Sequence, residues 1–224
     1  MKERHIRVAR TARYYTLGST GPDLREVWLV CHGIRQLARR FLPRFAGLDD
    51  GKRLIVAPEG LSRFYLRGPE SGRDKKIPIG ATWMTREDRE NEITDYVEFL
   101  DAVLDEVTGG SAGEPDAPLT VLGFSQGAHT VCRWLAAGDM PVARIILWGA
   151  YLPEDFDVER GPERLASAEL ILVRGLLDHF ISEEIHVAQE ARFQELGIPF
   201  KTITHAGGHE IDPALLGEIA GLKE

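Results

Sequence analysis

The sequence predicts an α/β fold in which a mostly parallel central sheet lies between two layers of helices, a three-layer sandwich. The first observation behind this prediction is that short apolar runs alternate with segments of helical periodicity along the 224 residues. The second is the segment Gly123-Phe124-Ser125-Gln126-Gly127, which stands where one apolar run gives way to a helical pattern. Because there are no internal repeats and no dividing linker, residues 1–224 are expected to form one domain.

Elements of the N-terminal half follow from the spacing of apolar residues. The run Glu26–Cys31 (E-V-W-L-V-C) is typical of a buried strand, whereas apolar residues recur at helical spacing over Gln36–Phe45. Residues His5–Val8 and Tyr14–Leu17 are expected as short strands of an edge hairpin. A further strand is predicted over Arg53–Ala57, where Pro58 ends it.

The C-terminal half continues the alternation. A long amphipathic helix is predicted over Glu90–Val107, before a loop rich in Gly and Pro. The remaining strands and helices are expected in this order: strand Leu119–Phe124, helix Gln126–Ala137, strand Ala143–Trp148, strand Glu169–Arg174, helix Ser182–Leu196, strand Phe200–Thr204 and helix Ile211–Ala220. The acidic stretch Tyr151–Pro162 is expected to be irregular.

Residues 58–89 do not fit a simple connection, because the segment is long, rich in Pro and Gly, and charged in its middle. We interpret it as a loop that lies over a pocket, since long loops in compact domains are often functional. Its large apolar side chains look exposed, and they either line the pocket or anchor the loop to the core. These side chains are Phe64, Tyr65, Leu66, Trp83 and Met84.

Composition limits the classes of partner. The net charge of −8 argues against nucleic acid, and the arginines at 35, 39, 40 and 44 are interpreted as a solvated helix face rather than a basic patch. No apolar run is long enough to cross a membrane, and no amphipathic anchor is evident, so stable membrane association is not expected. The basic segment Met1–Arg13 lacks the apolar region of a secretory signal, which favours the cytoplasm. Cys31 and Cys132 are expected to be buried, reduced thiols.

The serine at the strand–helix turn is the candidate nucleophile. A serine between two glycines at such a turn has the form of a nucleophile elbow, which lifts the Ser125 hydroxyl clear of the sheet. The alternative is a glycine-rich turn with an incidental serine. An alcohol is a poor nucleophile at neutral pH, so Ser125 would need a base, and that base would need a group that holds its tautomer.

Candidates for both roles follow later strands. Asp178 comes after the strand Glu169–Arg174, and His209 comes after the strand Phe200–Thr204. The carboxyl ends of parallel strands share one edge of a sheet, so both side chains are expected at the edge that carries Ser125. The chain order Ser, Asp, His is that of a known class of catalytic triad. His205 competes with His209, and the competitors of Asp178 are Asp155, Asp157 and Asp212, for which turn, surface and capping roles suffice.

An oxyanion intermediate would need two N–H donors. One is expected from Gln126, the residue after the nucleophile. The other is expected from the loop after the strand Glu26–Cys31, where Ile34 follows His32-Gly33. The alternative interpretation of His32-Gly33 is a glycine-assisted exit from the strand.

With these motifs the chain resembles the phospholipase/carboxylesterase family of α/β-hydrolases, which includes the acyl-protein thioesterases. The matching pieces are Cys31-His32-Gly33, Pro58, Trp83, Gly123-Phe124-Ser125-Gln126-Gly127-Ala128, Asp178 after Val173-Arg174-Gly175, and Gly208-His209. The resemblance implies a serine esterase with the α/β-hydrolase fold and no large cap domain. It also implies that the enzyme needs no cofactor, and the sequence has no metal-binding or nucleotide-binding motif.

Two positions depart from the family pattern. The family usually has a second glycine where this chain has Arg35, and its tryptophan is normally followed by Phe-Asp rather than by Met84-Thr85. A side chain at position 35 would reshape the oxyanion loop or place a cation at the rim of the pocket. Both departures fall in the region expected to face the substrate.

The expected function is hydrolysis of small to medium carboxylic esters through an acyl-enzyme on Ser125. The alternatives are an acyl-protein thioesterase or lysophospholipase that acts on long acyl chains, and a non-catalytic binding protein with a hydrolase frame. The expected partner is a small-molecule ester or thioester, and the sequence leaves a homodimer open.

Overall fold

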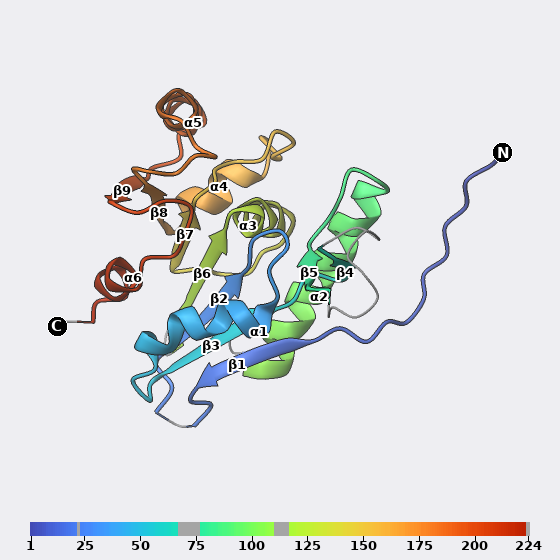
Figure 1. Ribbon diagram of the computed structural model, residues 1–224, viewed down its shortest axis with the longest axis horizontal. Coiled ribbons are helices and arrows are strands. Elements are labelled where there is room, and N and C mark those ends of the chain that lie inside the picture. Colours follow the sequence, from blue (N-terminus) through green and yellow to red (C-terminus); the bar gives the residue numbers. More distant parts are fainter. Residues whose placement is uncertain (22, 67–76, 110–116, 223–224) are drawn as a thin grey trace.

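The computed structural model describes residues 1–21, 23–66, 77–109 and 117–222, and it confirms the predicted α/β sandwich (Figure 1). A seven-stranded sheet in the order β1-β3-β2-β6-β7-β8-β9 forms the centre. Strand β1 pairs with β3 in antiparallel orientation, and every other neighbouring pair is parallel. The carboxyl ends of the parallel strands therefore meet along one edge of the sheet.

The strands of the central sheet are β1 (Tyr14–Gly18), β2 (Glu26–Cys31), β3 (Arg53–Pro58), β6 (Leu119–Phe124), β7 (Arg144–Trp148), β8 (Glu169–Gly175) and β9 (Lys201–His205). The helices are α1 (Ala38–Phe41), the 3-10 helix η1 (Leu42–Leu48), α2 (Arg89–Thr108), α3 (Gln126–Ala137), α4 (Gly161–Ala166), α5 (Glu183–Glu195) and α6 (Pro213–Ile219). Strands β2 and β6 and helix α3 have the predicted bounds, and the other predicted elements that form differ by a few residues at their ends.

Each face of the sheet carries its own hydrophobic core, because successive strand residues point to opposite faces. In β2, Val27 and Leu29 belong to the core that includes residues of helices α2, α3, α4 and α5, whereas Trp28 and Val30 belong to the core that includes residues of α1, η1 and α6. All four side chains are fully buried. A run of residues that is buried on both faces explains why this strand reads as continuously apolar rather than alternating.

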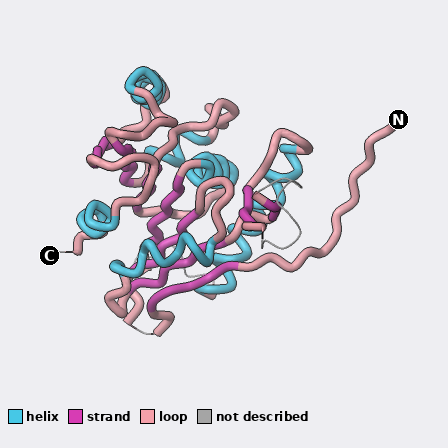
Figure 2. The backbone as a smooth tube through the Cα atoms, in the orientation of Figure 1, coloured by secondary structure: helices cyan, strands magenta, loops and turns pink. Residues whose placement is uncertain are grey.

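The structure corrects the prediction at the N-terminus and in the first helix. Residues His5–Val8 form no strand, and Figure 2 shows them as loop; with Ile6 and Val8 highly exposed, they pair with no described strand. Strand β1 instead pairs with β3. The helix predicted over Gln36–Phe45 begins at Ala38 and continues from Leu42 as η1, in which Pro43 lacks the N–H that an α-helix would use.

Three further elements were not predicted. The end of the acidic stretch forms α4, which begins at Gly161 with a proline in its first turn. Within residues 58–89, strands β4 (Ser62–Tyr65) and β5 (Ile79–Thr82) pair as an antiparallel hairpin, and the charged residues 67–76 between them lie outside the described residues. The N-terminal and C-terminal parts of this segment are therefore regular rather than irregular.

Among the described helices, none combines the length and the apolar content that a membrane-spanning helix requires.

Candidate active site

Ser125 occupies a strained turn between β6 and α3. Its φ of +54° lies in a region that residues other than glycine rarely adopt. The turn is tight on both sides, because a Cβ on Gly123 would lie 2.4 Å from the Ala128 Cα and one on Gly127 would lie 2.1 Å from the Cys31 carbonyl oxygen. Only glycine fits at either position, so the sequence pattern around Ser125 is required by the backbone itself.

His209 and Asp178 are hydrogen-bonded to each other. The His209 Nδ1 atom lies 2.7 Å from the Asp178 Oδ2 atom, and the side chain of Asp178 is fully buried while that of His209 is 19% exposed. The Asp178 Oδ1 atom also accepts the Phe180 N–H at 2.8 Å, which fixes the carboxylate. The loops after β8 and β9 thus bring together two residues that are 31 positions apart in the chain.

Phe124 connects the serine turn to the histidine. Its ring lies 4.9 Å from the His209 ring, centre to centre, and it immediately precedes Ser125. Gly149, directly after β7, leaves the room that His209 occupies, because a Cβ there would lie 3.0 Å from the His209 Cε1 atom. No hydrogen bond joins the Ser125 hydroxyl to another described residue, and such bonds are often long in enzymes without substrate.

The competing residues have other partners. The His205 Nδ1 atom accepts the Gly207 N–H at 3.2 Å, which is a turn contact. Asp212 caps helix α6 by accepting the Leu215 N–H at 2.9 Å. Asp157 accepts two backbone N–H groups from the turn that follows it.

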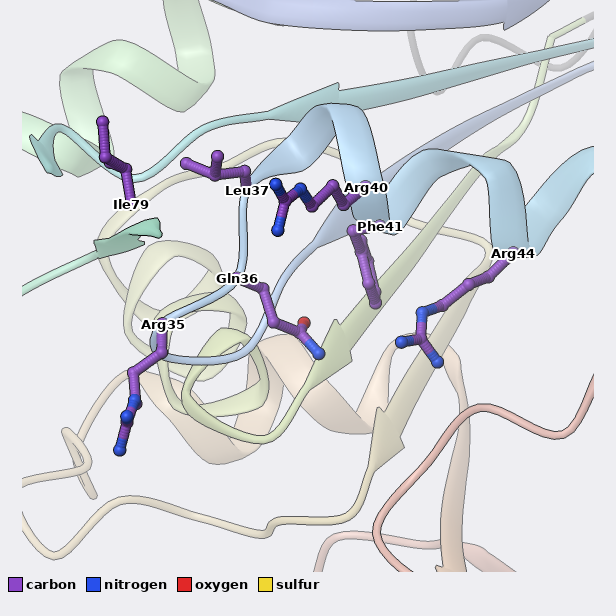
Figure 3. Close-up of a pocket in the computed structure, with 7 residues that line it drawn as sticks. All are labelled: Arg35, Gln36, Leu37, Arg40, Phe41, Arg44 and Ile79. Carbon is purple, nitrogen blue, oxygen red and sulfur yellow. The ribbon is translucent and has the colours of Figure 1, made fainter. Parts of the chain in front are cut away.

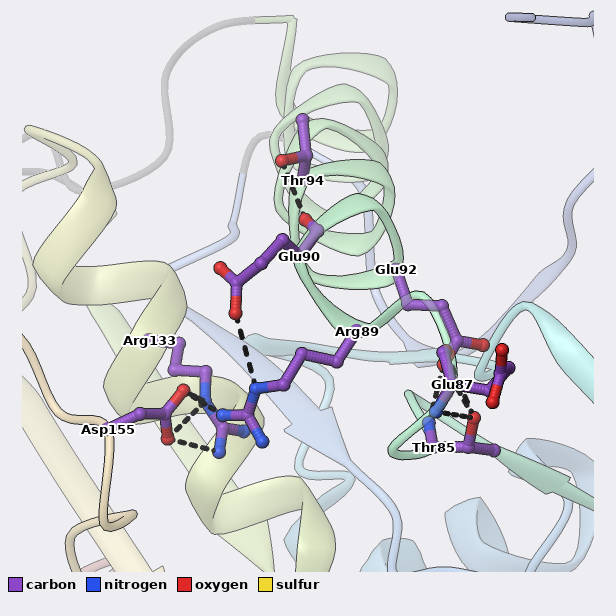
Figure 4. A network of polar contacts seen from close by, with 8 residues as sticks. All are labelled: Thr85, Glu87, Arg89, Glu90, Glu92, Thr94, Arg133 and Asp155. Carbon is purple, nitrogen blue, oxygen red and sulfur yellow. Dashed lines mark hydrogen bonds and ion pairs between the residues drawn. The ribbon is translucent and has the colours of Figure 1, made fainter. Parts of the chain in front are cut away.

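Asp155 is the centre of an ion-pair network (Figure 4). It contacts Arg133 of α3 in a two-pronged arrangement and also pairs with Arg89 at the start of α2. These arginines hold the pKa of the Asp155 carboxyl well below its usual range, against an opposing effect of burial. The network ties the stretch after β7 to helices α2 and α3, so Asp155 has a structural role in place of a catalytic one.

The loop that carries Ile34 is paired with the hairpin. The Arg35 N–H donates to the Ala81 carbonyl at 2.8 Å, and the Ala81 N–H donates to the Gln36 carbonyl at 2.9 Å. Ile34 is half exposed, and in the described part of the chain its N–H donates to no protein acceptor. Arg35 has a φ of +70°, so it holds the left-handed conformation that a glycine would adopt at the same place.

The side chain of Gln126 fastens the hairpin to the serine turn. Its amide contacts the Thr82 hydroxyl, donates to the Met84 carbonyl at 2.9 Å and accepts the Trp83 N–H at 3.2 Å. The sequence predicted a role only for the backbone N–H of Gln126 and not for its side chain. The long polar side chain directly after the serine could have indicated this role. Gln126 is the first residue of helix α3, so its N–H group, like the others of the first turn, has no acceptor within the helix.

His32 anchors the same loop from beneath. It is fully buried, its Nδ1 atom lies 2.8 Å from the Gly33 carbonyl oxygen, and its Nε2 atom accepts the Gly60 N–H at 3.0 Å. The indole N–H of Trp83 donates to the His32 carbonyl at 2.7 Å. Burial lowers the pKa of His32, which is consistent with a neutral ring that accepts a hydrogen bond.

The apolar residues of segment 58–89 divide into two groups. Trp83 and Met84 are buried, with 1% and 8% of their surface exposed, and they pack into the core on the α2 and α3 side. The expectation that they are exposed is therefore wrong, because their side chains anchor the hairpin to that core. Phe64 and Tyr65 on β4 are exposed, and Leu66 is partly buried.

Several other groups are chemically quiet. Cys31 and Cys132 are free and buried, and burial raises the pKa of both thiols, that of Cys132 to about 12. Among the described residues, one group of three side chains could hold a metal ion. It consists of Glu3, His5 and Asp88, which are all exposed and belong to the N-terminal segment and the start of α2.

Comparison with known proteins gives likeness in structure alone. No family model matches the chain, and no curated protein matches its sequence. A carboxylesterase from Mesorhizobium loti superposes with a TM-score of 0.67 at 19% identity, covering 94% of each chain. Acyl-protein thioesterase 2 from Zea mays superposes with a TM-score of 0.65 at 16% identity, over 94% of this chain and 97% of that one.

A third solved structure, YahD with malic acid, has a TM-score of 0.66 at 14% identity, over 94% of this chain and 97% of that one. The chain therefore has the α/β-hydrolase fold and is similar in structure to carboxylesterases and acyl-protein thioesterases.

Proposed function

We propose that this protein is a serine carboxylesterase that hydrolyses small to medium carboxylic esters through an acyl-enzyme on Ser125. The observation that carries the proposal is the buried Asp178 carboxylate bonded to His209, whose ring packs against the residue that precedes a strained serine. A strained turn persists only where its surroundings enforce it, and such turns cluster at active sites. The fold supports the same class of chemistry through its similarity to esterases and thioesterases.

In the proposed first step, His209 removes the proton of the Ser125 hydroxyl as its oxygen attacks the ester carbonyl. Asp178 accepts the Nδ1 proton of His209, so it fixes the tautomer that leaves Nε2 free as the base and stabilises the cationic ring. The N–H groups of Gln126 and Ile34 donate to the developing oxyanion. His209 then gives its proton to the leaving alcohol.

The second step repeats the chemistry with water. His209 removes a proton from the water molecule, whose oxygen attacks the acyl carbon, and then returns the proton to Ser125 as the acid departs. The chain needs no cofactor for either step.

The small-substrate form is favoured over a long-chain thioesterase or lysophospholipase. Of the residues predicted to line an acyl pocket, Trp83 and Met84 are buried in the core, which leaves Phe64, Tyr65, Leu66 and the rim residue Arg35 as candidates. YahD, which is similar in fold, was solved with malic acid, a small ligand. A cytoplasmic location and the homodimer remain predictions.

The test is hydrolysis of p-nitrophenyl esters over a series of acyl lengths, with the wild type beside Ser125→Ala. We expect turnover that depends on Ser125 and peaks at short acyl groups. A peak at long acyl groups would favour the thioesterase or lysophospholipase. Folded protein without turnover at any length would favour a binding protein that keeps the frame and lacks the chemistry.

A further inference from the structure

A pocket lined by three arginines adjoins the proposed active site. It has a volume of about 190 Å³ and lies between the loop after β2, helix α1 and the start of β5 (Figure 3). Arg35, Arg40 and Arg44 line it together with Gln36 and Phe41, and the rest of the lining is aliphatic. All four arginines of positions 35, 39, 40 and 44 are exposed, as expected for a solvated face, and three of them also line this cavity.

Within the described ranges, these three arginines have no acidic partner. None of them forms an ion pair with a described carboxylate, although the chain carries 35 acidic residues against 27 basic ones. Elsewhere arginines are paired: Arg53 with Glu26, Arg144 with Glu169, and Arg13 with Glu59. Unpaired guanidinium groups in the lining of a cavity, here those of Arg40 and Arg44, provide a site for an external anion.

The carboxylate beside this pocket is already occupied. Glu59 is buried and accepts the Ala38 N–H at the start of α1, at 3.2 Å. Its other partners are Arg13 and Arg63, at 2.7 and 3.3 Å, rather than the arginines of the pocket. Glu59 therefore does not neutralise the positive charge of Arg40 and Arg44.

Gln36 adds a neutral donor to the lining of the pocket. Its Oε1 atom accepts the Gly33 N–H at 2.9 Å, so the NH₂ group is the part of the amide that can donate to a ligand. In Figure 3 the guanidinium groups of Arg40 and Arg44 lie on either side of Phe41, the amide of Gln36 lies below Arg40 beside the same ring, and the Arg35 side chain points away. Two guanidinium groups and one amide match the acceptors of a carboxylate or phosphate.

The pocket lies next to Ser125 through two short contact paths. Gln36 holds Gly33, and a Cβ on Gly33 would lie 3.2 Å from the Ser125 Cβ atom. Phe41, in the wall of the pocket, lies 6.1 Å ring to ring from Phe124, the residue before the serine. The pocket therefore adjoins the turn that carries Ser125, so an anion in the pocket and an ester carbonyl at Ser125 can belong to one substrate.

We propose that the ester substrate carries an anionic group, a carboxylate or phosphate, which binds between Arg40 and Arg44 while its carbonyl lies at Ser125. This proposal rests on the proposed esterase function and specifies its substrate class. The arginines are binding residues that position the substrate, and the chemistry at Ser125 is unchanged.

The experiment compares kcat/KM for pairs of esters that are matched in size and differ in charge. On the acyl side the pair is mono-p-nitrophenyl adipate and p-nitrophenyl hexanoate, and on the alcohol side it is acetoxyacetate and propyl acetate, followed by acid release. We expect the wild type to prefer the anionic member of at least one pair by about 10-fold or more, the range of a charge-assisted hydrogen bond.

Variants then assign the preference to the pocket. The double variant Arg40→Gln/Arg44→Gln should bring the ratio of anionic to neutral turnover close to one. Arg39→Gln is the control, because Arg39 is exposed like Arg40, its neighbour in α1, but does not line the pocket, and its ratio should equal that of the wild type. Inhibition by inorganic phosphate that is stronger than inhibition by acetate would identify the anion as a phosphate, and the reverse order would identify a carboxylate.

The outcomes separate the two proposals. Turnover of neutral esters with no anionic preference, or a preference that survives in the double variant, would overturn the anion site and leave the esterase standing. If no ester is turned over, the esterase proposal fails, and calorimetric titration with adipate decides the pocket independently. Binding to the wild type that is lost in the double variant would then support the anion site, and equal heats in both proteins would refute it.

Discussion

The serine half and the histidine half of the candidate site are held in different ways. Ser125 lies in a turn that Gly123 and Gly127 pack against neighbouring backbone, and its loop partner His32 is fully buried. His209 is instead partly exposed and is oriented by one carboxylate and two aromatic rings. One of those rings, Phe180, is 74% exposed.

This difference indicates which substitutions should affect both stability and activity and which should affect activity alone. The serine half belongs to the fold, because β6, α3 and the hairpin meet there, so changes in it should affect folding and activity together. The histidine half is built from the loops after β8 and β9, and the large apolar side chains of the first of these loops, Leu176, Leu177 and Phe180, are exposed rather than packed in the core. Changes in that half should reduce activity and leave the free energy of unfolding nearly unchanged.

The largest effect is expected from Gly127→Ala. The new methyl group would lie 2.1 Å from the Cys31 carbonyl oxygen, which cannot move without disturbing β2. We expect destabilisation on the order of 5 kcal/mol, with loss of activity, measured by urea unfolding. Gly138→Ala, just beyond the same helix, is the control: its nearest contact is at 3.6 Å, and its stability should change by less than about 0.5 kcal/mol.

Asp178→Asn, in the histidine half, should reduce activity without a comparable loss of stability. The amide would no longer accept the Nδ1 proton of His209 as the carboxylate does, so the ring would favour the wrong tautomer. We expect kcat to fall roughly 10³- to 10⁴-fold, with little change in Tm. Asp212→Asn, which keeps the cap of α6, should retain wild-type turnover, and a similar loss in both variants would count against the assignment of Asp178.

Acidification should weaken the serine half. Burial, followed by the charge of Arg133, lowers the pKa of His129 in α3 to about 4, whereas an unfolded histidine titrates near 6.5. The unfolded chain therefore takes up this proton first, so stability falls as the pH decreases from about 6.5 toward 4. We expect a loss on the order of 1–3 kcal/mol, measured by urea unfolding across this range.

His129→Asn should reduce that pH dependence. The part that remains is expected from His32, whose pKa is also lowered by burial. A variant with the full wild-type slope would show that His129 does not contribute.

The smallest effect is expected from Phe180→Ala. The Phe180 ring lies 4.8 Å from the His209 ring but is mostly exposed, so its removal loosens the imidazole without opening the core. We expect kcat to fall about 3- to 10-fold with Tm within about 2 °C of the wild type. A large loss of Tm would show that the loop after β8 supports the fold, contrary to the comparison of the two halves.

The fold could be predicted from the sequence largely because its central strands are continuous apolar runs that are easily recognised. Glu26–Cys31 and Leu119–Phe124 are buried on both faces and therefore read as continuous apolar runs. The hairpin could not be found, because β4 is short and mostly exposed and its partner lies beyond a charged segment. The strand expected over His5–Val8 failed because local apolar spacing does not say whether a partner strand is available.

The candidate site was predicted in part. The pairing of Asp178 with His209 followed from strand order alone, since both follow adjacent parallel strands. Burial of Trp83 and the gathering of Arg40 and Arg44 around one cavity depend on how the hairpin packs on the loop after β2, which no local pattern encodes.

The most direct test of the central claim is covalent labelling with a serine-reactive fluorophosphonate, followed by peptide mass spectrometry. An activated nucleophile predicts one modified residue, Ser125, with labelling lost in Ser125→Ala and strongly slowed in Asp178→Asn. Folded protein that is not labelled, or labelling that persists in Ser125→Ala, would contradict the claim that Ser125 is the nucleophile.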